Sequence, residues 1–197
     1  GDMNRKRTKS MYLRQGTGML GRISLCMVLL GAGFFSRSYR HQLEEIQTTL
    51  DRNAGFISSY ANAAITKGDS LSGEDFINYI YSAVRLTDTT VLVCNTKGQI
   101  LCAAGVNLNE DLLNSSTIAD LSVPSWAVNQ LLNGKPYSGG TTFGQLLSSK
   151  CYLSSEDISP LVRDRVSGEL ISSGNPTGFL FVAADATSVL DFLENTF

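Results

Sequence analysis

The sequence has little of the residues from which catalytic and metal sites are commonly built. His41 is its only histidine, so neither a histidine-based catalytic triad nor a histidine-rich metal site can form. Beyond the apolar N-terminal segment the cysteines are Cys94, Cys102 and Cys151, and their spacing matches no zinc pattern. We interpret them as buried free thiols, although the sequence leaves a disulfide between Cys102 and Cys151 open. We therefore expect no catalytic site, cofactor or bound metal within these residues.

Positive charge is scarce beyond residue 40. Residues 1–40 contain eight Lys and Arg and one Asp, whereas residues 41–197 contain eight Lys and Arg and seventeen Asp and Glu. The second part thus has a formal charge of −9. Because proteins that bind nucleic acid use strongly basic surfaces, we expect no nucleic-acid partner.

One long apolar run follows the basic N-terminus. Residues 23–35 carry no charge, and residues 17–36 form a segment of 20 residues. As a helix this segment is about 30 Å long, which spans the hydrocarbon core of a bilayer. Arg22 lies near its basic end, where a long side chain can reach the headgroups. The pattern predicts a basic cytoplasmic tail over residues 1–16, a single transmembrane helix in contact with lipid over residues 17–36, and the remainder outside the cell membrane.

Two other interpretations of this run stay open. A charged segment followed by a short apolar run is also typical of a secretory signal peptide, and residues 31–33 would then supply a small-residue cleavage site. A buried core helix is disfavoured, because no amphipathic partner pattern surrounds the run. Either membrane-linked interpretation places the rest of the chain beyond a membrane.

Three glycines before the run match the pattern of a dinucleotide-binding loop. Gly16, Gly18 and Gly21 have the required spacing. Such a loop also needs a preceding hydrophobic strand and an acidic residue about 20 positions later. A basic segment precedes these glycines and an apolar run follows them, so we interpret them as an irregular start of the membrane helix.

Residues 37–68 have the pattern of a long stalk helix. Apolar and small residues recur at alternating three- and four-residue spacing, which is typical of a coiled-coil seam. Asn53 within this seam is a residue type that fixes register in a dimer. The same face could instead pack on its own domain. The seam consists of Leu43, Ile46, Leu50, Asn53, Ile57, Tyr60 and Ala64.

Residues 69–197 alternate between helical and extended patterns. A capping signal at Ser72 predicts a second helix, and Pro124 predicts the start of another that ends at Asn133 and Gly134. The apolar run at 178–184 predicts a central strand. Further strands are expected at 89–94, 99–104, 137–147, 150–153 and 158–162, a closing helix at 186–197, and polar loops at 105–122 and 163–177.

This order of elements resembles the extracytoplasmic PAS-like sensor domains called PDC or single Cache, above all those of sensor histidine kinases of Gram-positive bacteria. The resemblance implies an α+β fold with a central antiparallel sheet of about five strands, a long N-terminal helix and flanking helices. Two departures lie near the expected pocket: the Gly and Pro usual after Tyr152 are absent, and the connector before Gly178 is long. The matching segments are residues 91–101, 131–137, 142–152 and 177–193.

The resemblance also implies a function. The chain would be the input module of a two-component histidine kinase. It would form a homodimer and bind an unidentified small molecule. Its kinase core would lie beyond these residues, after a second membrane helix starting near Phe197. The alternatives are the ectodomain of a chemoreceptor or cyclase, and a secreted or tethered binding protein without kinase output.

The pocket of a PAS-like sensor lies on one face of the sheet. By resemblance Trp126, Tyr137, Phe143 and Tyr152 would surround it, with Arg163 at its mouth to pair with an anion. Aromatic side chains with polar tips suit such a pocket. Trp126 and Phe143 could instead fill the core, and Arg163 could be a solvent-facing loop residue. We interpret the remaining loop acids, Asp157, Asp164 and Glu169, as solvated rather than metal-binding.

Overall fold

A computed structural model describes residues 2–117 and 120–187, with side chains from residue 10 onward. The chain divides into two compact units, Gly1–Gln42 and Leu43–Phe197. Helix α1 (Asp2–Thr66) accounts for the described part of the first unit and contributes residues to the second.

The first unit is uninterrupted helix. Gly16, Gly18 and Gly21 lie inside α1, so the expected irregular start of the membrane helix is wrong, and these glycines do not form a strand-to-helix turn. The apolar side chains of residues 17–36 are exposed; Leu30, for example, is 73% exposed. Within the described residues one helix is long and apolar enough to cross a membrane, and its most apolar window has a mean hydropathy of 1.7. A signal sequence would meet the same criterion.

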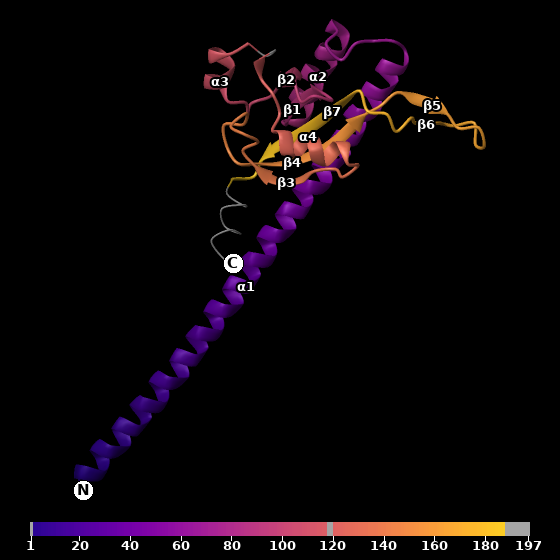
Figure 1. Cartoon of the computed structure of the whole chain (residues 1–197). Helices are drawn as coiled ribbons and strands as arrows, with labels where there is room; N and C mark the ends of the chain where they lie inside the picture. Colours follow the sequence, from indigo (N-terminus) through magenta and orange to yellow (C-terminus); the bar gives the residue numbers. More distant parts are fainter. Residues whose placement is uncertain (1, 118–119, 188–197) are drawn as a thin grey trace. The chain divides into compact units, whose positions relative to one another are not determined.

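The second unit is built on a five-stranded antiparallel sheet (Figure 1). The strand order is β2-β1-β7-β4-β3, so the last strand within the described residues, β7, lies at the centre. This confirms the predicted α+β class and the predicted central position of the apolar run. The strands are β1 (Thr90–Asn95), β2 (Ile100–Ala104), β3 (Ser138–Thr141), β4 (Cys151–Ile158) and β7 (Gly178–Asp185).

Strand β7 is apolar at nearly every position because both of its faces are covered. Leu180 and Val182 belong to one core, whereas Phe179 and Phe181 belong to a second core on the opposite face. Successive side chains of a strand point to opposite faces, which separates these two pairs. The sequence alone predicts a single core that Val91, Val93, Ile100, Phe179 and Phe181 share. That expectation is wrong, since the two valines lie with Leu180 and Val182 and Ile100 lies with the two phenylalanines.

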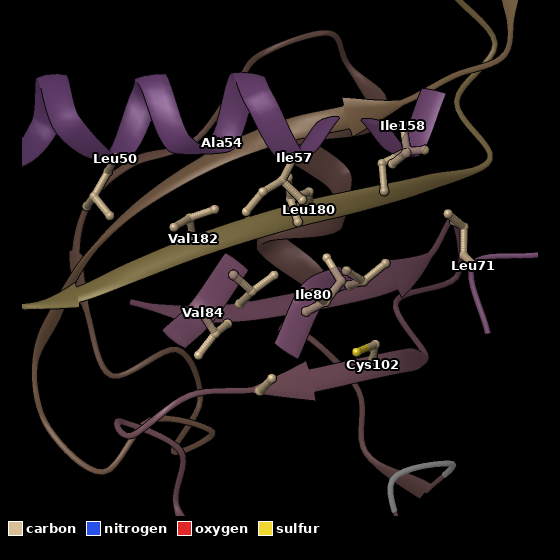
Figure 2. Close-up of a cluster of buried hydrophobic side chains, with 14 of the residues drawn as sticks. Leu50, Ala54, Ile57, Leu71, Ile80, Val84, Cys102, Ile158, Leu180 and Val182 are labelled. Atoms are coloured by element: carbon tan, nitrogen blue, oxygen red, sulfur yellow. The ribbon is translucent and has the colours of Figure 1, made fainter. Parts of the chain in front are cut away.

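Helices α1 and α2 (Glu74–Thr87) cover the first face. Figure 2 shows Leu50, Ala54 and Ile57 of α1 in this core with Leu180 and Val182 of β7. Leu50 and Ile57 are almost completely buried. These turns of the predicted coiled-coil seam therefore pack on their own domain, which was the second interpretation of the pattern.

The turn between β1 and β2 forms where Asn95 and Gly98 predict it. Gly98 has a positive φ of 88°, a conformation that glycine adopts at little cost. Asn95 contributes in another way: its side-chain oxygen accepts hydrogen bonds from the backbone N–H groups of Lys97 and Gln99, both at 3.0 Å. The side chain thus stabilises the turn locally.

Several predicted boundaries differ from the structure. Strand β3 ends at Thr141 rather than 147, because Phe143, Gly144 and Gln145 all have positive φ. Strand β4 is continuous through the gap expected at 154–157, and α2 begins after Gly73 without a side-chain cap. The predicted loops contain helix α3 (Glu110–Ser115) and the hairpin of β5 (Leu161–Arg163) and β6 (Leu170–Ser172). The predicted closing helix lies outside the described residues from 188 onward.

Candidate ligand-binding site

Helix α4 (Ser125–Leu132) covers the second face of the sheet. It begins after Pro124 and ends at Asn133, as predicted, and Gly134 follows with a φ of 75°. Its buried residues Ala127, Val128 and Leu131 pack in the core that contains Phe179 and Phe181. Trp126 at its start and Leu132 at its end are 45% and 52% exposed, so both ends of the helix border solvent.

Three of the predicted site residues come together beside α4. The ring of Trp126 lies 5.0 Å from that of Tyr137 and 6.0 Å from that of Phe143, both in edge-to-face geometry. Phe143 is fully buried and lies 4.7 Å from Phe181, so it serves as a core residue. Tyr137 is half-buried, and burial, with a smaller effect of Tyr152, raises the pKa of its hydroxyl.

Tyr152 lies on the opposite face of the sheet. Its ring belongs to the core beneath α1 and α2, and its hydroxyl is 3.0 Å from the Ser138 hydroxyl. Ser138 in turn accepts a hydrogen bond from the side-chain amide of Gln47 at 3.2 Å. The structure therefore brings Trp126, Tyr137 and Phe143 together on the face of the second core, whereas the ring of Tyr152 packs in the first core.

Arg163 lies in β5 of the exposed hairpin. Its guanidinium donates a hydrogen bond to the carbonyl oxygen of Gly168 at 2.6 Å. Asp164 in the same hairpin accepts hydrogen bonds from the Val166 N–H and the Ser167 hydroxyl, which lower the pKa of its carboxyl. In this structure Arg163 and Asp164 both contribute to the geometry of the hairpin.

A pocket of about 360 Å³ lies near the C-terminal ends of α4 and β4. Sequence reasoning missed it. The available signal was the pair Glu156 and Asp157, two adjacent carboxylates in an otherwise apolar and small-residue strand. Apolar residues, prolines and glycines form the rest of the wall. The lining residues are Leu131, Leu132, Gly134, Pro136, Glu156, Asp157, Gly174 and Pro176.

Strand alternation turns the side chains of the two acidic lining residues to opposite faces of the sheet, because Asp157 lies opposite Phe179 and Glu156 lies opposite Leu180. None of the described residues that line the pocket is Lys, Arg or His. Burial, and then repulsion from Asp157 and Asp51, raises the pKa of Glu156 above its ordinary value of 4.5. Asp51 on α1 accepts a hydrogen bond from the Ser154 hydroxyl at 2.5 Å, and Asp157 accepts one from the Ser159 hydroxyl at 2.9 Å.

Helix α1 binds the edge of β4 beyond the end of β3. The ladder of β3 and β4 ends at Ser138 and Ser154, and the Ser155 N–H donates to the Tyr137 carbonyl at 3.1 Å. Beyond Ser155 this edge of β4 pairs with no strand of the described residues. Three polar side chains of α1 take this place. The Ser58 hydroxyl donates to the Asp157 carbonyl at 3.0 Å, the Asn62 side-chain oxygen accepts from the Ser159 N–H at 2.8 Å, and the Thr66 hydroxyl accepts from the Leu161 N–H at 2.8 Å.

The spacing of these contacts matches the geometry of both elements. Four helical residues rise about 6 Å and two residues of an antiparallel strand about 6.8 Å. Positions 58, 62 and 66 of α1 can therefore bond positions 157, 159 and 161 in register. Strand β4, whose end lines the pocket, is thereby joined directly to the long helix.

Comparison with known proteins gives limited similarity. No protein-family model matches the sequence, and the comparison with curated proteins gives no match. Among solved structures the chain is similar to the ligand-binding domain of the Campylobacter jejuni chemoreceptor Tlp3, determined in complex with 4-methylisoleucine. The TM-score is 0.41 and the sequence identity 13%, over 78% of this chain and 62% of that one. This chain thus spans less than two thirds of the length of that domain.

Proposed function

We propose that this chain is the sensory input module of a membrane-anchored signalling protein and binds a small molecule outside the cell membrane. The observation that carries the proposal is that helix α1 combines two features. It contains an exposed apolar segment of membrane length, and it also contains the side chains that bond the edge of β4 beside the pocket. One helix thereby belongs to both the anchor and the sensor.

The proposed division of the chain follows the sequence. Residues 1–16 are the cytoplasmic tail, residues 17–36 the lipid-embedded span, residues 37–68 the stalk, and residues 69–197 the sensor domain. A ligand that favours one arrangement of β4 shifts the equilibrium by its difference in affinity for the two arrangements. The bonded side chains of α1 respond to that shift, and paired membrane helices in a homodimer transmit it to the output domain.

The output domain we propose is a histidine kinase. Support comes from the resemblance of the strand–turn–strand segment at 91–101 and the central strand at 178–185 to the PDC sensors of such kinases. In the structure these segments form the β1–β2 hairpin and β7, and β1 pairs with both β2 and β7. Reading the gene beyond Phe197 tests this step. A second apolar span followed by a kinase core is the expected result, and a methyl-accepting or cyclase domain would contradict it.

Ligand binding can be tested with the only tryptophan of the chain. Trp126 lies at the start of α4 with its ring half-exposed and in contact with Tyr137, so its emission should report rearrangements of α4 and of the segment around Tyr137. We propose a screen of chemically diverse small molecules on the full chain in non-ionic detergent, by Trp126 fluorescence and thermal unfolding together. A ligand at a hundred times its dissociation constant should stabilise the fold by about 2.7 kcal/mol.

The control is Trp126→Phe, which removes the fluorescence signal and should keep the thermal stabilisation. The proposed function is contradicted if no class of small molecule gives a saturable response in either measurement.

A further inference from the structure

We propose that the hairpin of β5 and β6 is a contact between two copies of this chain, in which the two β6 strands pair antiparallel about a two-fold axis at Ile171. The inference goes beyond the proposed function, because it concerns neither the ligand nor the membrane helix. The hairpin lies in the long connector before Gly178, where the chain departs from the PDC pattern, so the resemblance assigns it no role.

The hairpin exposes large apolar side chains on both of its faces. Val162 lies opposite Ile171, and the next pair is Arg163 and Leu170. Ile171 and Leu170 therefore point to opposite faces, and both are exposed, Ile171 by 45%. Figure 1 shows β5 and β6 extending away from the five-stranded sheet. Because a two-stranded hairpin alone is marginally stable in water, this one has the surface of an incomplete sheet.

The outer edge of β6 can accept another strand. The Asp164 N–H donates to the Glu169 carbonyl at 2.8 Å, and hydrogen-bonded pairs alternate along an antiparallel ladder. The backbone groups of Leu170 and Ser172 therefore point to the outer edge, and no described strand pairs with them there. Edge strands are commonly protected by lysine, proline or a bulge. Strand β6 contains neither lysine nor proline.

The outer edge of β5 is already in use. The Leu161 N–H donates to the Thr66 hydroxyl of α1 at 2.8 Å. A strand that adds to the hairpin therefore finds its free backbone groups on β6.

The segment around β6 is suited to pairing with itself. It lies between Gly168 and Gly174, which have φ values of 73° and 72°, and Ile171 is its middle residue. An axis at Ile171 places Gly168 of one copy opposite Gly174 of the other, so neither end brings a side chain against the second copy. It also places Leu170 opposite Ser172, and their outward backbone groups then form reciprocal hydrogen bonds on both sides of the axis.

Side-chain packing favours the same register. Val162 and Ile171 are direct cross-strand neighbours within each hairpin. At the axis the two Ile171 residues form a non-hydrogen-bonded pair, in which Cα atoms are about 4.5 Å apart. A row of Val162, Ile171, Ile171 and Val162 then crosses four strands on one face. Directly opposite side chains are the pairs that stabilise a sheet, so each hairpin covers the apolar row of the other.

Charge explains why this part of an acidic domain meets a second copy. Residues 41–197 have a formal charge of −9, so two copies repel each other over much of their surface. The hairpin has a formal charge of zero, from Arg163, Asp164, Arg165 and Glu169. In the proposed register the two Glu169 residues are about 14 Å apart, four residues at about 3.4 Å each. That separation exceeds the Debye length of about 8 Å, whereas a register centred on Glu169 would place the two carboxylates directly opposite.

The test is disulfide cross-linking of the full chain in non-ionic detergent, with copper phenanthroline as the oxidant. Cys26 is exposed and the other three cysteines are buried, so Cys26→Ser provides the background. Ile171→Cys places two thiols across the axis at a Cα distance that a disulfide accepts. We expect it to form a covalent dimer at least about tenfold faster than Val166→Cys, because pairing raises the effective concentration of the thiols. Val166 at the tip is 95% exposed, so random collision would give the opposite order.

Proline at position 172 tests the strand pairing itself. In the Ile171→Cys chain, Ser172→Pro removes the outward N–H and should abolish the cross-link, because proline cannot donate to a ladder. The matched control is Ser172→Ala, which keeps that N–H and should leave cross-linking unchanged. Both variants remove the hydroxyl that accepts the Gly174 N–H at 3.2 Å. Thermal unfolding of each variant verifies that it is folded.

Three outcomes overturn the proposal. Absence of a cross-link in Ile171→Cys would show that the edge serves another protein, a membrane or no partner. Equal or faster cross-linking of Val166→Cys would show only that the copies are near each other, for example through paired membrane helices. A cross-link that persists in Ser172→Pro would show that the copies meet at Ile171 without strand pairing. The ligand screen tests the sensory function separately, so either proposal can fail alone.

Discussion

Truncation of Phe181 tests the division of the sheet into two cores. Phe181 is fully buried on β7, and its ring lies 4.7 Å from that of Phe143. Replacement of a buried phenylalanine by alanine costs about 3–5 kcal/mol, from lost burial and the cavity that remains. Loss of the ring pair accounts for about 0.5–1.5 kcal/mol of stabilisation beyond burial. We therefore expect Phe181→Ala to lower the free energy of unfolding by about 3–5 kcal/mol.

A double-mutant cycle locates the loss on one face. Milder changes are needed, because the whole fold is stabilised by only about 5–15 kcal/mol. Phe181→Leu combined with Phe143→Leu should show a coupling energy of about 0.5–1.5 kcal/mol. Phe181→Leu combined with Ile57→Val should be additive within about 0.5 kcal/mol, because Ile57 lies in the core on the other face.

The assay is urea unfolding of the full chain in non-ionic detergent, followed by circular dichroism and by Trp126 emission. Coincidence of the two transitions supports a two-state analysis. A loss below about 1 kcal/mol for Phe181→Ala would refute the placement of β7 between two cores. Equal coupling of Phe181 to Ile57 and to Phe143 would refute the separation of the faces.

Three further predictions follow from the contacts around β4 and from the N-terminal segment. The pKa of Glu156 is raised in the folded protein, so the fold loses stability as pH rises through that pKa and the carboxyl becomes charged. Glu156→Gln removes this charge and should therefore raise the melting temperature at neutral pH. The difference should shrink in acid, where the wild-type carboxyl is protonated, and an advantage that grows in acid would contradict the assignment. Asn62→Ala should lower the free energy of unfolding in urea by about 1–3 kcal/mol, because it leaves the buried N–H of Ser159 without its acceptor. Asn62→Asp keeps an acceptor oxygen and should lower it less. Equal losses in the two variants would show that the hydrogen bond is unimportant. The full-length protein should stay in the membrane fraction after washing at high salt and alkaline pH, whereas a soluble product that begins near Gly33 would show that the apolar segment is a cleaved signal peptide.

The central strand was predictable, and its division between two cores was harder to see. A run that is apolar at every position indicates burial on both faces, and residues 178–184 have this pattern. The run itself has no alternation that separates one face from the other. Only the pairing of β7 with β1 and β4 shows that Leu180 shares a core with Val91 while Phe181 shares one with Ile100.

The long helix shows a similar limit. A helix that packs on a sheet and a helix in a dimer both require apolar residues at three- and four-residue spacing. The positions of Leu50 and Ile57 were therefore correct as a buried face, although the sequence could not identify the partner. The polar residues Ser58, Asn62 and Thr66 gave no recognisable signal, because their role depends on the edge of a strand about a hundred residues away.

The candidate site was only partly accessible to sequence reasoning. Trp126, Tyr137 and Phe143 are close together, although Phe143 lies in a turn after β3 and not in the strand predicted at 137–147. Tyr152 lies on the opposite face of the sheet. Its face depends on the strand register, and a change of one residue in the register moves a side chain to the opposite face. The pocket beside Glu156 and Asp157 is formed by segments from α4 to the loop after β6, a grouping that only the tertiary fold produces.

Hydrogen exchange of the full chain, with and without a saturating ligand identified by the Trp126 screen, tests the coupling of the pocket to the long helix. If the account is correct, ligand slows the exchange of β4 amides around residues 155–159 and also of α1 amides around residues 58–66. Asn62→Ala should reduce the response of α1 and leave that of β4. Slowed exchange confined to β4 and α4, with α1 unchanged in the wild type, would contradict the proposal that this chain transmits ligand binding through α1.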